Sequence, residues 1–430
     1  MVETGLIVAY GSLLTMACIP IYAGSFESLK GVKRPKNAAP RKKSNNPLDD
    51  SDSESESITE SLSANDAWMF PVFGSGVLFS LYLLFRFLNK EYINYLLTGY
   101  FAILGCAAVA KVGLLLAKKA LPFSVLKHVE KYKVTISKQG KHLYNANFTA
   151  VHAGLLTTSI LLTVYYVLTK NWIASNFFGI CFALNAIQLL SLDSFKTGMI
   201  LLSGLFFYDI FWVFGTEVMV SVAKNFDAPI KVVWPKDIIG VLAGTVEKTE
   251  FTMLGLGDIV IPGIFVALCL RFDHHQAWQR NPTGNFRSTN FSRPYFTSCA
   301  IAYITGLVTT VVVMHTFQAA QPALLYLSPA CILSTLLTAA VRGEIKELFA
   351  YSTEEDNEEA KKSKKSEKKE ETVKEEKKTV ETVDTVEETD KADEADVEDE
   401  DYVAVNADDS KGASPKASKK KKGSKKKSGK

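Results

Sequence analysis

The chain has 430 residues, 47% of them hydrophobic, and a net charge of only +3. A soluble chain of this length normally divides into domains with alternating or amphipathic patterns. Here the apolar residues form near-continuous runs of about 20 up to residue 341, followed by a tail rich in Lys and Glu. These features exclude a soluble globular protein and indicate one that is embedded in a membrane.

Nine apolar runs are each long enough to cross about 30 Å of hydrocarbon. A helix is expected for each, because a helix satisfies its own backbone hydrogen bonds in lipid. The first run could instead be a cleaved signal peptide, but basic residues follow it rather than precede it, which favours an uncleaved span. We predict an all-α polytopic membrane protein with nine transmembrane helices, at about 5–25, 67–88, 92–117, 150–169, 173–192, 197–220, 251–270, 295–315 and 321–341.

The sequence divides into three regions. Residues 1–196 would hold the first five helices, with a disordered acidic loop near 38–62, and residues 197–341 would hold helices six to nine with the catalytic groups. Residues 342–430 would form a disordered cytosolic tail, because blocks of like charge are typical of solvated segments. Its lysines favour attraction to anionic lipid over nucleic acid, and we expect no nucleic-acid partner.

Basic residues predict the orientation of the chain. Lys and Arg collect after the first, third and seventh runs, and are scarce after the second, fourth and eighth; the loop after the sixth is mixed. Since cytosolic loops are the basic ones, the C-terminus should be cytosolic and the N-terminus should lie across the membrane. The sites Asn147-Phe148-Thr149 and Asn290-Phe291-Ser292 would then face the cytosol, so we expect no glycosylation there.

Two acidic residues lie within the apolar runs, far from either end. Asp209 is inside the sixth run and Asp258 inside the seventh. A carboxylate at the centre of a bilayer costs roughly 2.5–3.5 kcal/mol, so such residues tend to mark function. Each lies about 12 residues, or roughly 18 Å, from the predicted cytosolic surface. On antiparallel neighbouring helices the two carboxyls could therefore meet.

A pair of buried carboxyls can hydrolyse peptide bonds. Two acids about 3 Å apart cannot both ionise in a low dielectric, so they share one proton. The ionised acid would take a proton from an attacking water, and the protonated acid would donate to the peptide carbonyl. Which of Asp209 and Asp258 plays which role cannot be assigned, because the pair titrates as one unit.

Several neighbouring residues suit such a site. Gly255 and Gly257 remove side-chain bulk before Asp258, so that a substrate backbone could lie close. The hydroxyl of Tyr208 could form a hydrogen bond near Asp209, or its ring could simply pack. The prolines of the ninth run open the helix, and an unwound segment there could pair with an extended substrate. Spacing alone favours the other interpretation, a kinked helix that only packs. A straight-helix count also places Pro322 nearer the far surface than the two aspartates.

Other reactive side chains carry no site. The six cysteines have neither metal-ligand nor redox spacing and are interpreted as small apolar residues. His274 and His275 are expected in a solvated cytosolic loop, without a metal-ligand partner at helical spacing. Serine-hydrolase elbows, HExxH motifs and phosphate-binding glycine loops are absent from the sequence.

Three short motifs resemble those of the presenilin-type intramembrane aspartyl proteases. Tyr208-Asp209 is similar to their YD motif, Gly255-Leu256-Gly257-Asp258 to their GxGD motif, and Pro322-Ala323-Leu324 to their PAL motif. The longer strings GLFFYDIFWVFGTEVMV, LGLGDIVIPGIFVALCLRFD and QPALLYLSPAC resemble the signal peptide peptidase branch of this family. The resemblance covers the nine-helix region and leaves out the tail.

This resemblance implies an endopeptidase of the endoplasmic reticulum membrane that cleaves signal peptides and type II-oriented membrane segments. Asp209 and Asp258 would be catalytic, and Pro322, Ala323 and Leu324 would shape the site and hold substrate. The resemblance further implies a lumenal N-terminus, a homo-oligomer, possible contact with membrane-protein quality-control factors, and no metal or organic cofactor.

Two other functions remain open from the residues alone. Asp209 and Asp258 could form the proton or cation site of a transporter, although such proteins usually show repeated halves, and we find no convincing internal repeat. A catalytically idle scaffold for membrane proteins is the third reading, and the presence of both aspartates counts against it.

Overall fold

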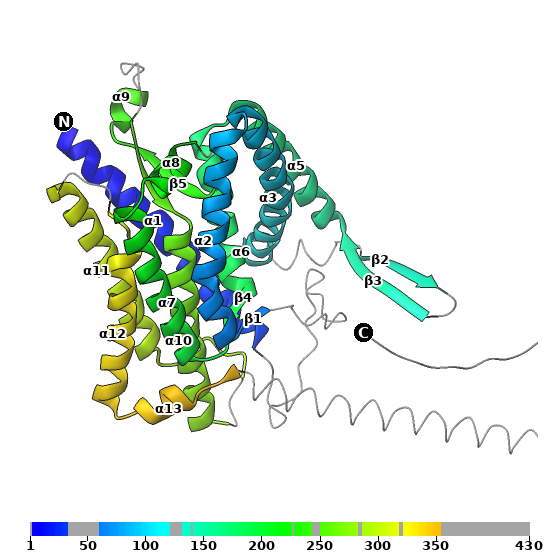
Figure 1. Cartoon of the computed structure of the whole chain (residues 1–430). Coiled ribbons are helices and arrows are strands. Elements are labelled where there is room, and N and C mark those ends of the chain that lie inside the picture. The colour runs from blue at the N-terminus through cyan, green and yellow to red at the C-terminus, as the bar shows by residue number, and fades with distance from the viewer. Residues whose placement is uncertain are drawn as a thin grey trace, which may run out of the picture. The chain divides into compact units, whose positions relative to one another are not determined.

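The computed structural model describes residues 2–32, 60–120, 131–138, 141–225, 228–242, 250–282, 286–317 and 321–353. Helices dominate this part of the chain, as predicted, and the long ones run side by side in a bundle (Figure 1). The helices are α1 (Val2–Ser28), α2 (Ala64–Phe87), α3 (Lys90–Ala120), α5 (Ala150–Thr169), α6 (Trp172–Leu189), α7 (Phe195–Asp209), α8 (Val218–Asn225), α9 (Ile238–Leu242), α10 (Gly257–Arg280), α11 (Pro294–Phe317), α12 (Leu324–Arg342) and α13 (Ile345–Ala350).

Three small sheets of two strands each accompany the helices. Strand β1 (Glu60–Leu62) pairs in parallel with β4 (Leu190–Leu192). Strands β2 (Lys131–Lys138) and β3 (Lys141–Thr149) form an antiparallel hairpin with one irregularity in register. Strands β5 (Lys231–Pro235) and β6 (Phe251–Gly255) are also antiparallel. This last pair, which we call the β5–β6 ribbon, leads directly into α10.

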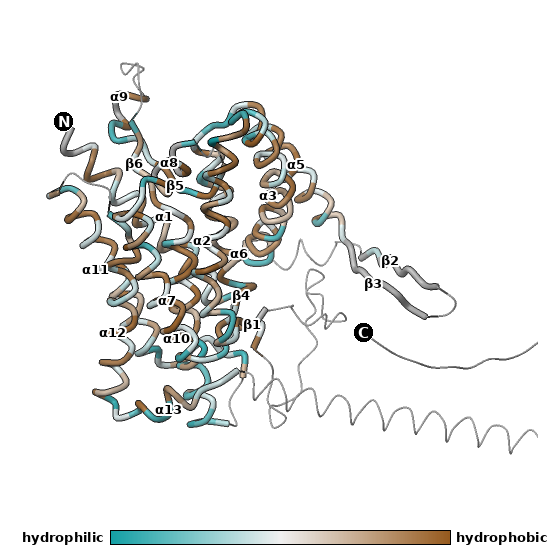
Figure 2. Tube along the Cα trace, in the orientation of Figure 1, coloured by the Kyte–Doolittle hydropathy of each residue, from teal (hydrophilic) through white to brown (hydrophobic). Residues whose placement is uncertain are grey.

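The described helices confirm the polytopic membrane architecture. Eight of them are long and apolar enough to cross a bilayer: α1, α2, α3, α5, α6, α7 with the turn after it, α11 and α12. Hydrophobic residues fill their middles, and hydrophilic residues collect around α13 and near β5 (Figure 2). Large apolar side chains such as Trp68, Leu168 and Val341 are mostly exposed, as expected where helices face lipid instead of water.

The helix α10 corresponds to the seventh predicted span and differs from the other eight. Its 24 residues suffice to cross a bilayer, but its polar ends make it less apolar than the eight helices named above. Every residue from Ile264 to Leu270 is at most 1% exposed, because α1, α6, α11 and α12 pack around the helix. The structure therefore encloses α10 in protein, where its sequence need not match lipid.

Local sequence signals account for several helix ends. Ser63 and Asp66 form a reciprocal capping box at the start of α2. Asn171 caps α6 and Ser194 caps α7, each through a side-chain oxygen that accepts a backbone N–H. Gly343 ends α12 with φ of 71°, a left-handed conformation that glycine adopts at little cost.

A glycine allows α7 and α10 to approach closely. A Cβ atom on Gly198 would lie 2.7 Å from the ring of Phe265 on α10, a separation too short for any real side chain. Phe195, at the start of α7, packs edge-on against Phe265 and Phe272 at ring-centroid distances of 6.0 and 5.3 Å. This tight contact brings together the two helices that carry the mid-membrane aspartates.

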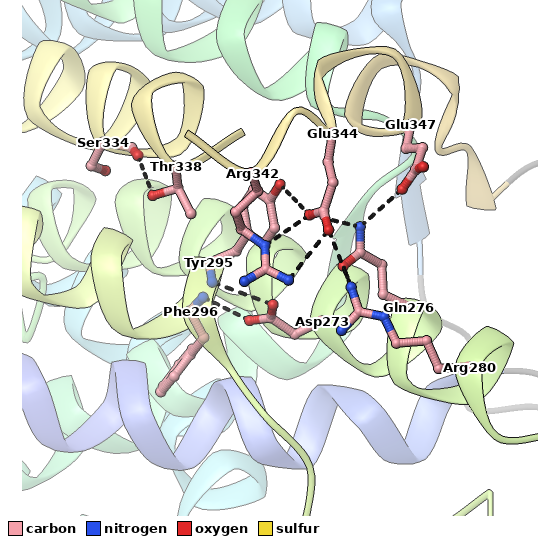
Figure 3. A network of polar contacts seen from close by, with 10 residues as sticks. All are labelled: Asp273, Gln276, Arg280, Tyr295, Phe296, Ser334, Thr338, Arg342, Glu344 and Glu347. Atoms are coloured by element: carbon pink, nitrogen blue, oxygen red, sulfur yellow. Dashed lines mark hydrogen bonds and ion pairs between the residues drawn. The ribbon is translucent and has the colours of Figure 1, made fainter. Parts of the chain in front are cut away.

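Polar side chains join three helices at one end of the bundle. We call this end, where α1 finishes at Ser28 and α12 at Arg342, the basic end. Figure 3 shows the carboxylate of Glu344 there, accepting from Tyr295 at 2.8 Å and contacting Arg280 at 3.1 Å and Arg342 at 3.0 Å. The cluster links α10, α11 and the end of α12.

The segment after this cluster crosses the basic end and fastens to α7. Leu348 of α13 is fully buried, and Tyr351 packs against Phe195 and Phe272. The backbone N–H of Thr353 then donates to the carbonyl of Asp193 at 2.9 Å, just before α7 begins. The chain from Glu344 to Thr353 therefore ties the basic ends of α7, α10 and α12 together.

Candidate active site

Asp209 lies where α7 changes its helical form. The regular helix ends at Asp209, and residues Ile210–Phe214 form a π-helical turn. Such turns are rare, and they occur frequently at functional sites. The predicted sixth span at 197–220 is therefore interrupted, since α8 begins separately at Val218. Asp209 itself is buried, with 4% of its surface exposed.

Asp258 lies in the first turn of α10, immediately after the β5–β6 ribbon. The sequence predicted a helix from 251 to 270, but Phe251–Gly255 is a strand and the helix begins at Gly257. The backbone N–H of Gly255 donates a hydrogen bond to the Asp258 carboxylate. A carboxylate at this position is also favoured by the positive end of the helix dipole. The start of α10 is therefore a position at which a carboxylate is less costly inside the membrane.

The two carboxyls lie at matching depths in the bundle. The ring contact between Phe195 and Phe272 marks a common level near the basic end. Asp209 follows Phe195 by about 14 residues and Asp258 precedes Phe272 by about 14, so each lies about 21 Å from that level. The charge of Asp209 acts on Asp258. The structure therefore places the two acids at one depth, on two helices that are in contact.

The PAL residues complete this arrangement. Pro322, Ala323 and Leu324 are all buried; Leu324 is the first residue of α12, and Pro322 and Ala323 immediately precede it. The backbone N–H of Leu324 donates a hydrogen bond to the Asp209 carboxylate. This N–H belongs to the first turn of the helix, where backbone donors lack partners within the helix. The segment reaches Asp209 because α12 packs against α7, the helix that carries this aspartate.

Comparison with known proteins supports the same interpretation. The family model described as signal peptide peptidase matches residues 54–355. The chain belongs to the signal peptide peptidase family. It is 42% identical to human signal peptide peptidase over 355 residues, which cover 82% of this chain and 85% of the human protein. It is also 40% identical to a probable intramembrane protease of Schizosaccharomyces pombe over 294 residues, 68% of this chain and 84% of that protein.

A nematode relative agrees over a shorter region. Intramembrane protease 2 of Caenorhabditis elegans is 46% identical over 230 residues, covering 52% of this chain and 47% of that protein. As a member of the signal peptide peptidase family, the chain is an intramembrane protease with several membrane-spanning helices.

The remaining predicted site residues have distinct environments in this family member. The ring of Tyr208 lies against α2, close enough that a Cβ on Gly74 would be 3.7 Å from it; this contact supports packing. Leu256 packs near Gly179 of α6, whereas Gly257 is exposed and nothing lies within 4 Å of a Cβ built there. Space for a substrate backbone therefore exists at Gly257.

One contact at the site was not predicted from the sequence. The hydroxyl of Tyr303 on α11 donates to the backbone carbonyl of Asp258 at 3.4 Å, and Tyr303 is 1% exposed. The contact holds the first turn of α10 against α11. Tyr303 lies in an otherwise apolar run, so no sequence pattern distinguishes it from an aromatic side chain that only packs in the core.

The histidine prediction was wrong for His274. The helix α10 continues to Arg280, and His274 is buried, with Nε2 2.7 Å from the carbonyl oxygen of Phe286. This is a packing environment and not a solvated loop. Within the described part of the chain, no group of three or more His, Cys, Asp or Glu residues is arranged to hold a metal ion.

Proposed function

We propose that this chain is an aspartyl endopeptidase of the endoplasmic reticulum membrane, with Asp209 and Asp258 as its catalytic pair. Its substrates would be signal peptides and type II-oriented membrane segments. The observation that supports the proposal is that two carboxyls, one from α7 and one from α10, lie at one depth inside the bundle. The names of the human and mouse relatives, both signal peptide peptidases, support this substrate class.

The mechanism follows from a pair of acids that holds one proton. The ionised carboxylate removes a proton from water as the water oxygen attacks the peptide carbonyl carbon. The protonated carboxyl donates its proton to the carbonyl oxygen. When the tetrahedral intermediate collapses, the carbon–nitrogen bond breaks and the nitrogen leaves with a proton from the pair. The Leu324 and Gly255 N–H groups each face one carboxyl, so neither acid is singled out as the base.

The β5–β6 ribbon offers an extended substrate a backbone edge next to Asp258. The N–H of Leu256 donates to Ile230 at 2.9 Å and that of Lys236 donates to Glu250 at 2.8 Å. The backbone N–H and C=O groups of even-numbered residues therefore point to the partner strand, and those of odd-numbered residues point to the outer edges of the ribbon. The backbone groups of Met253 thus point to the outer edge of β6, where no partner is found among the described residues.

An unpaired backbone group at membrane depth is costly unless water or another strand meets it. Strand addition at this edge would satisfy the Met253 backbone and lay the substrate chain toward Asp258. The sequence placed strand addition at the ninth helix; the ribbon is the better support for it, since the PAL segment starts a helix. In this proposal Leu324 contributes its N–H to Asp209, and Pro322 and Ala323 shape the site.

The wider setting of the enzyme is part of the same proposal. We expect a lumenal N-terminus and a cytosolic C-terminus, from the distribution of basic residues. A homo-oligomer and contacts with quality-control factors are expected from the family resemblance alone. The chemistry described above needs neither a metal ion nor an organic cofactor.

Peptide cleavage by purified protein tests the proposal. The protein in detergent is incubated with a labelled signal peptide, beside the Asp209→Asn and Asp258→Asn variants. Each variant keeps the shape of the side chain but loses the titrating group, so cleavage should fall by about 10²–10⁴-fold. Asp237→Asn is the matched control: Asp237 is exposed and caps the N–H of Gly240, a role that asparagine fills equally well.

Three results would contradict the proposal. Equal product from the wild type and both active-site variants would remove the catalytic role of the aspartates. Ion flux in proteoliposomes that is lost in the Asp258→Asn protein, without peptide product from the wild type, would favour a transporter. Binding of membrane proteins without any cleavage would favour a scaffold.

A further inference from the structure

A side chain of α6 occupies one outer edge of the β5–β6 ribbon. The Nδ2 of Asn176 donates to the carbonyl of Val233 at 2.6 Å, and the N–H of Val233 donates to Oδ1 of Asn176 at 2.8 Å. A side-chain amide carries the same donor and acceptor as a peptide group. Asn176 therefore stands where a third strand would pair with β5, and it is only 4% exposed.

The helix α6 follows the ribbon along its length. Near one end, the ring of Trp172 packs against Trp234 of β5 and Phe251 of β6, at centroid distances of 5.5 and 6.4 Å. Near the other end, a Cβ on Gly179 would lie 3.8 Å from the side chain of Leu256. The polar contact of Asn176 lies between these two apolar contacts. The ribbon is thus held by α6 on the side opposite to the free edge of β6.

We propose that Asn176 is a positioning and specificity-determining residue of the peptidase. By filling the outer edge of β5, it leaves the Met253 edge of β6 as the place where a substrate strand pairs. A substrate that pairs there meets Asp258 in one register, so one peptide bond is presented to the two acids. Asn176 acts through the ribbon and touches no reacting atom. The inference rests on the proposed function and adds to it the choice of edge and of bond.

The loss of Asn176 should change the bond that is cut as well as the rate. Without its amide, the N–H and C=O of Val233 lose their partners, and β5 presents a second edge to an extended chain. A substrate could then pair on either side, and the ribbon could shift against α6. A contact that only stabilised the fold would instead lower the amount of folded enzyme without altering which bond is cleaved.

Asn185 provides a matched control on the same helix. It is 7% exposed, and its Nδ2 donates to the carbonyls of Ala108 at 3.1 Å and Cys181 at 2.8 Å. Asn185→Ala therefore removes the same kind of buried contact from α6 but leaves the ribbon untouched. Any change that is shared by variants of Asn176 and Asn185 reports on the helix and its folding.

The experiment measures kcat, KM and the identity of the products by mass spectrometry, with one labelled signal peptide and the full chain in detergent. For Asn176→Ala we expect kcat to fall between about tenfold and a hundredfold, as for other small misplacements of reacting groups, and new termini to appear at neighbouring bonds. Asn176→Asp keeps the volume and the acceptor for the Val233 N–H but sets an oxygen against the Val233 carbonyl. Asn176→Asp should also produce new termini, and it tests the inference if the alanine variant does not fold.

The outcomes separate this inference from the proposed function. Asn185→Ala should yield the wild-type termini, whatever its effect on the melting temperature. Folded Asn176 variants that cut the wild-type bonds in the wild-type ratio would overturn the role of Asn176 while leaving the aspartyl mechanism in place. If the wild-type enzyme makes no product, the proposed function fails and this inference fails with it.

Discussion

The cluster at the basic end predicts how stability depends on Glu344. Although its burial raises the pKa of this carboxyl, hydrogen bonds from Arg342, Tyr295 and Gln276 lower it to about 2, from an ordinary value of 4.5. A depressed folded-state pKa means that the charge stabilises the fold above pH 4.5. That contribution is lost as the pH falls from 4.5 toward 2.

The size of the effect follows from the shift in pKa. At 1.36 kcal/mol per unit, a shift from 4.5 to about 2 corresponds to roughly 3 kcal/mol. The side chain of Glu344 is 13% exposed, so solvent screens the interaction only in part. Glu344→Gln leaves the hydroxyl of Tyr295 a neutral acceptor but removes the charge beside Arg280 and Arg342. We expect it to lower the free energy of unfolding by about 2–3 kcal/mol at pH 7.

Thermal unfolding of both proteins in the same detergent, from pH 7 to pH 3, measures this effect. The melting temperature of Glu344→Gln should be several degrees below the wild type at pH 7. The gap should narrow as the pH falls below 4.5, because the carboxyl of the unfolded chain then begins to protonate while that of the folded protein stays ionised until the pH approaches 2. Glu91→Gln, at an exposed carboxyl in the first turn of α3, serves as the control. Equal melting temperatures at pH 7, or a gap that stays constant with pH, would refute the reasoning.

Three further predictions concern residues on or beside α7 and α10. Gly255→Ala places a Cβ 3.2 Å from Oδ2 of Asp258 and should lower kcat by about three- to tenfold. The Cβ of Gly257→Ala meets no atom within 4 Å, so this variant should change KM, because the open space there is left for substrate. Steady-state kinetics with the reverse pattern would contradict this prediction. Gly198→Ala forces apart α7 and α10 and should cost about 1–3 kcal/mol in unfolding experiments; an unchanged melting temperature would disprove the contact. Tyr208→Phe should keep activity within about twofold, since the contact of Tyr208 with α2 is a packing contact that phenylalanine preserves. A loss of activity above tenfold would show that the hydroxyl takes part.

The membrane architecture was predictable because the length and hydropathy of each segment, read from that segment alone, determine whether it can span a bilayer as a helix. The eight apolar helices are confirmed, and seven of them lie close to their expected limits; the sixth ends at Phe214, short of the predicted 220. The seventh run was not predictable in detail, since a short apolar segment such as Phe251–Gly255 reads equally well as helix or strand. Its far end was also misjudged, because Arg271 and Asp273 suggest a membrane surface. In the structure Asp273 is buried and accepts the N–H groups of Tyr295 and Phe296 at the start of α11.

The candidate site was predictable in its acids but not in its backbone contacts. Asp209 and Asp258 were found because charge in an apolar run is unusual, and the resemblance supplied their motif. Their catalytic role stays a prediction. The donor to Asp209 is the backbone N–H of Leu324, and a backbone group carries no sequence signal. Asn176 is likewise an ordinary polar residue in an apolar run, and only its position beside Val233 gives it meaning.

The enclosure of α10 has a consequence for the biogenesis of this protein. A helix that begins with a carboxylate and ends with charged residues inserts poorly on its own, and α10 is covered by partners that are synthesised both before and after it. Its place in the bundle therefore depends on α11 and α12, which follow it in the described part of the chain. Because both helices are made after α10, we expect its enclosure, with Asp258 at its start, to be completed only after α11 and α12 have been synthesised.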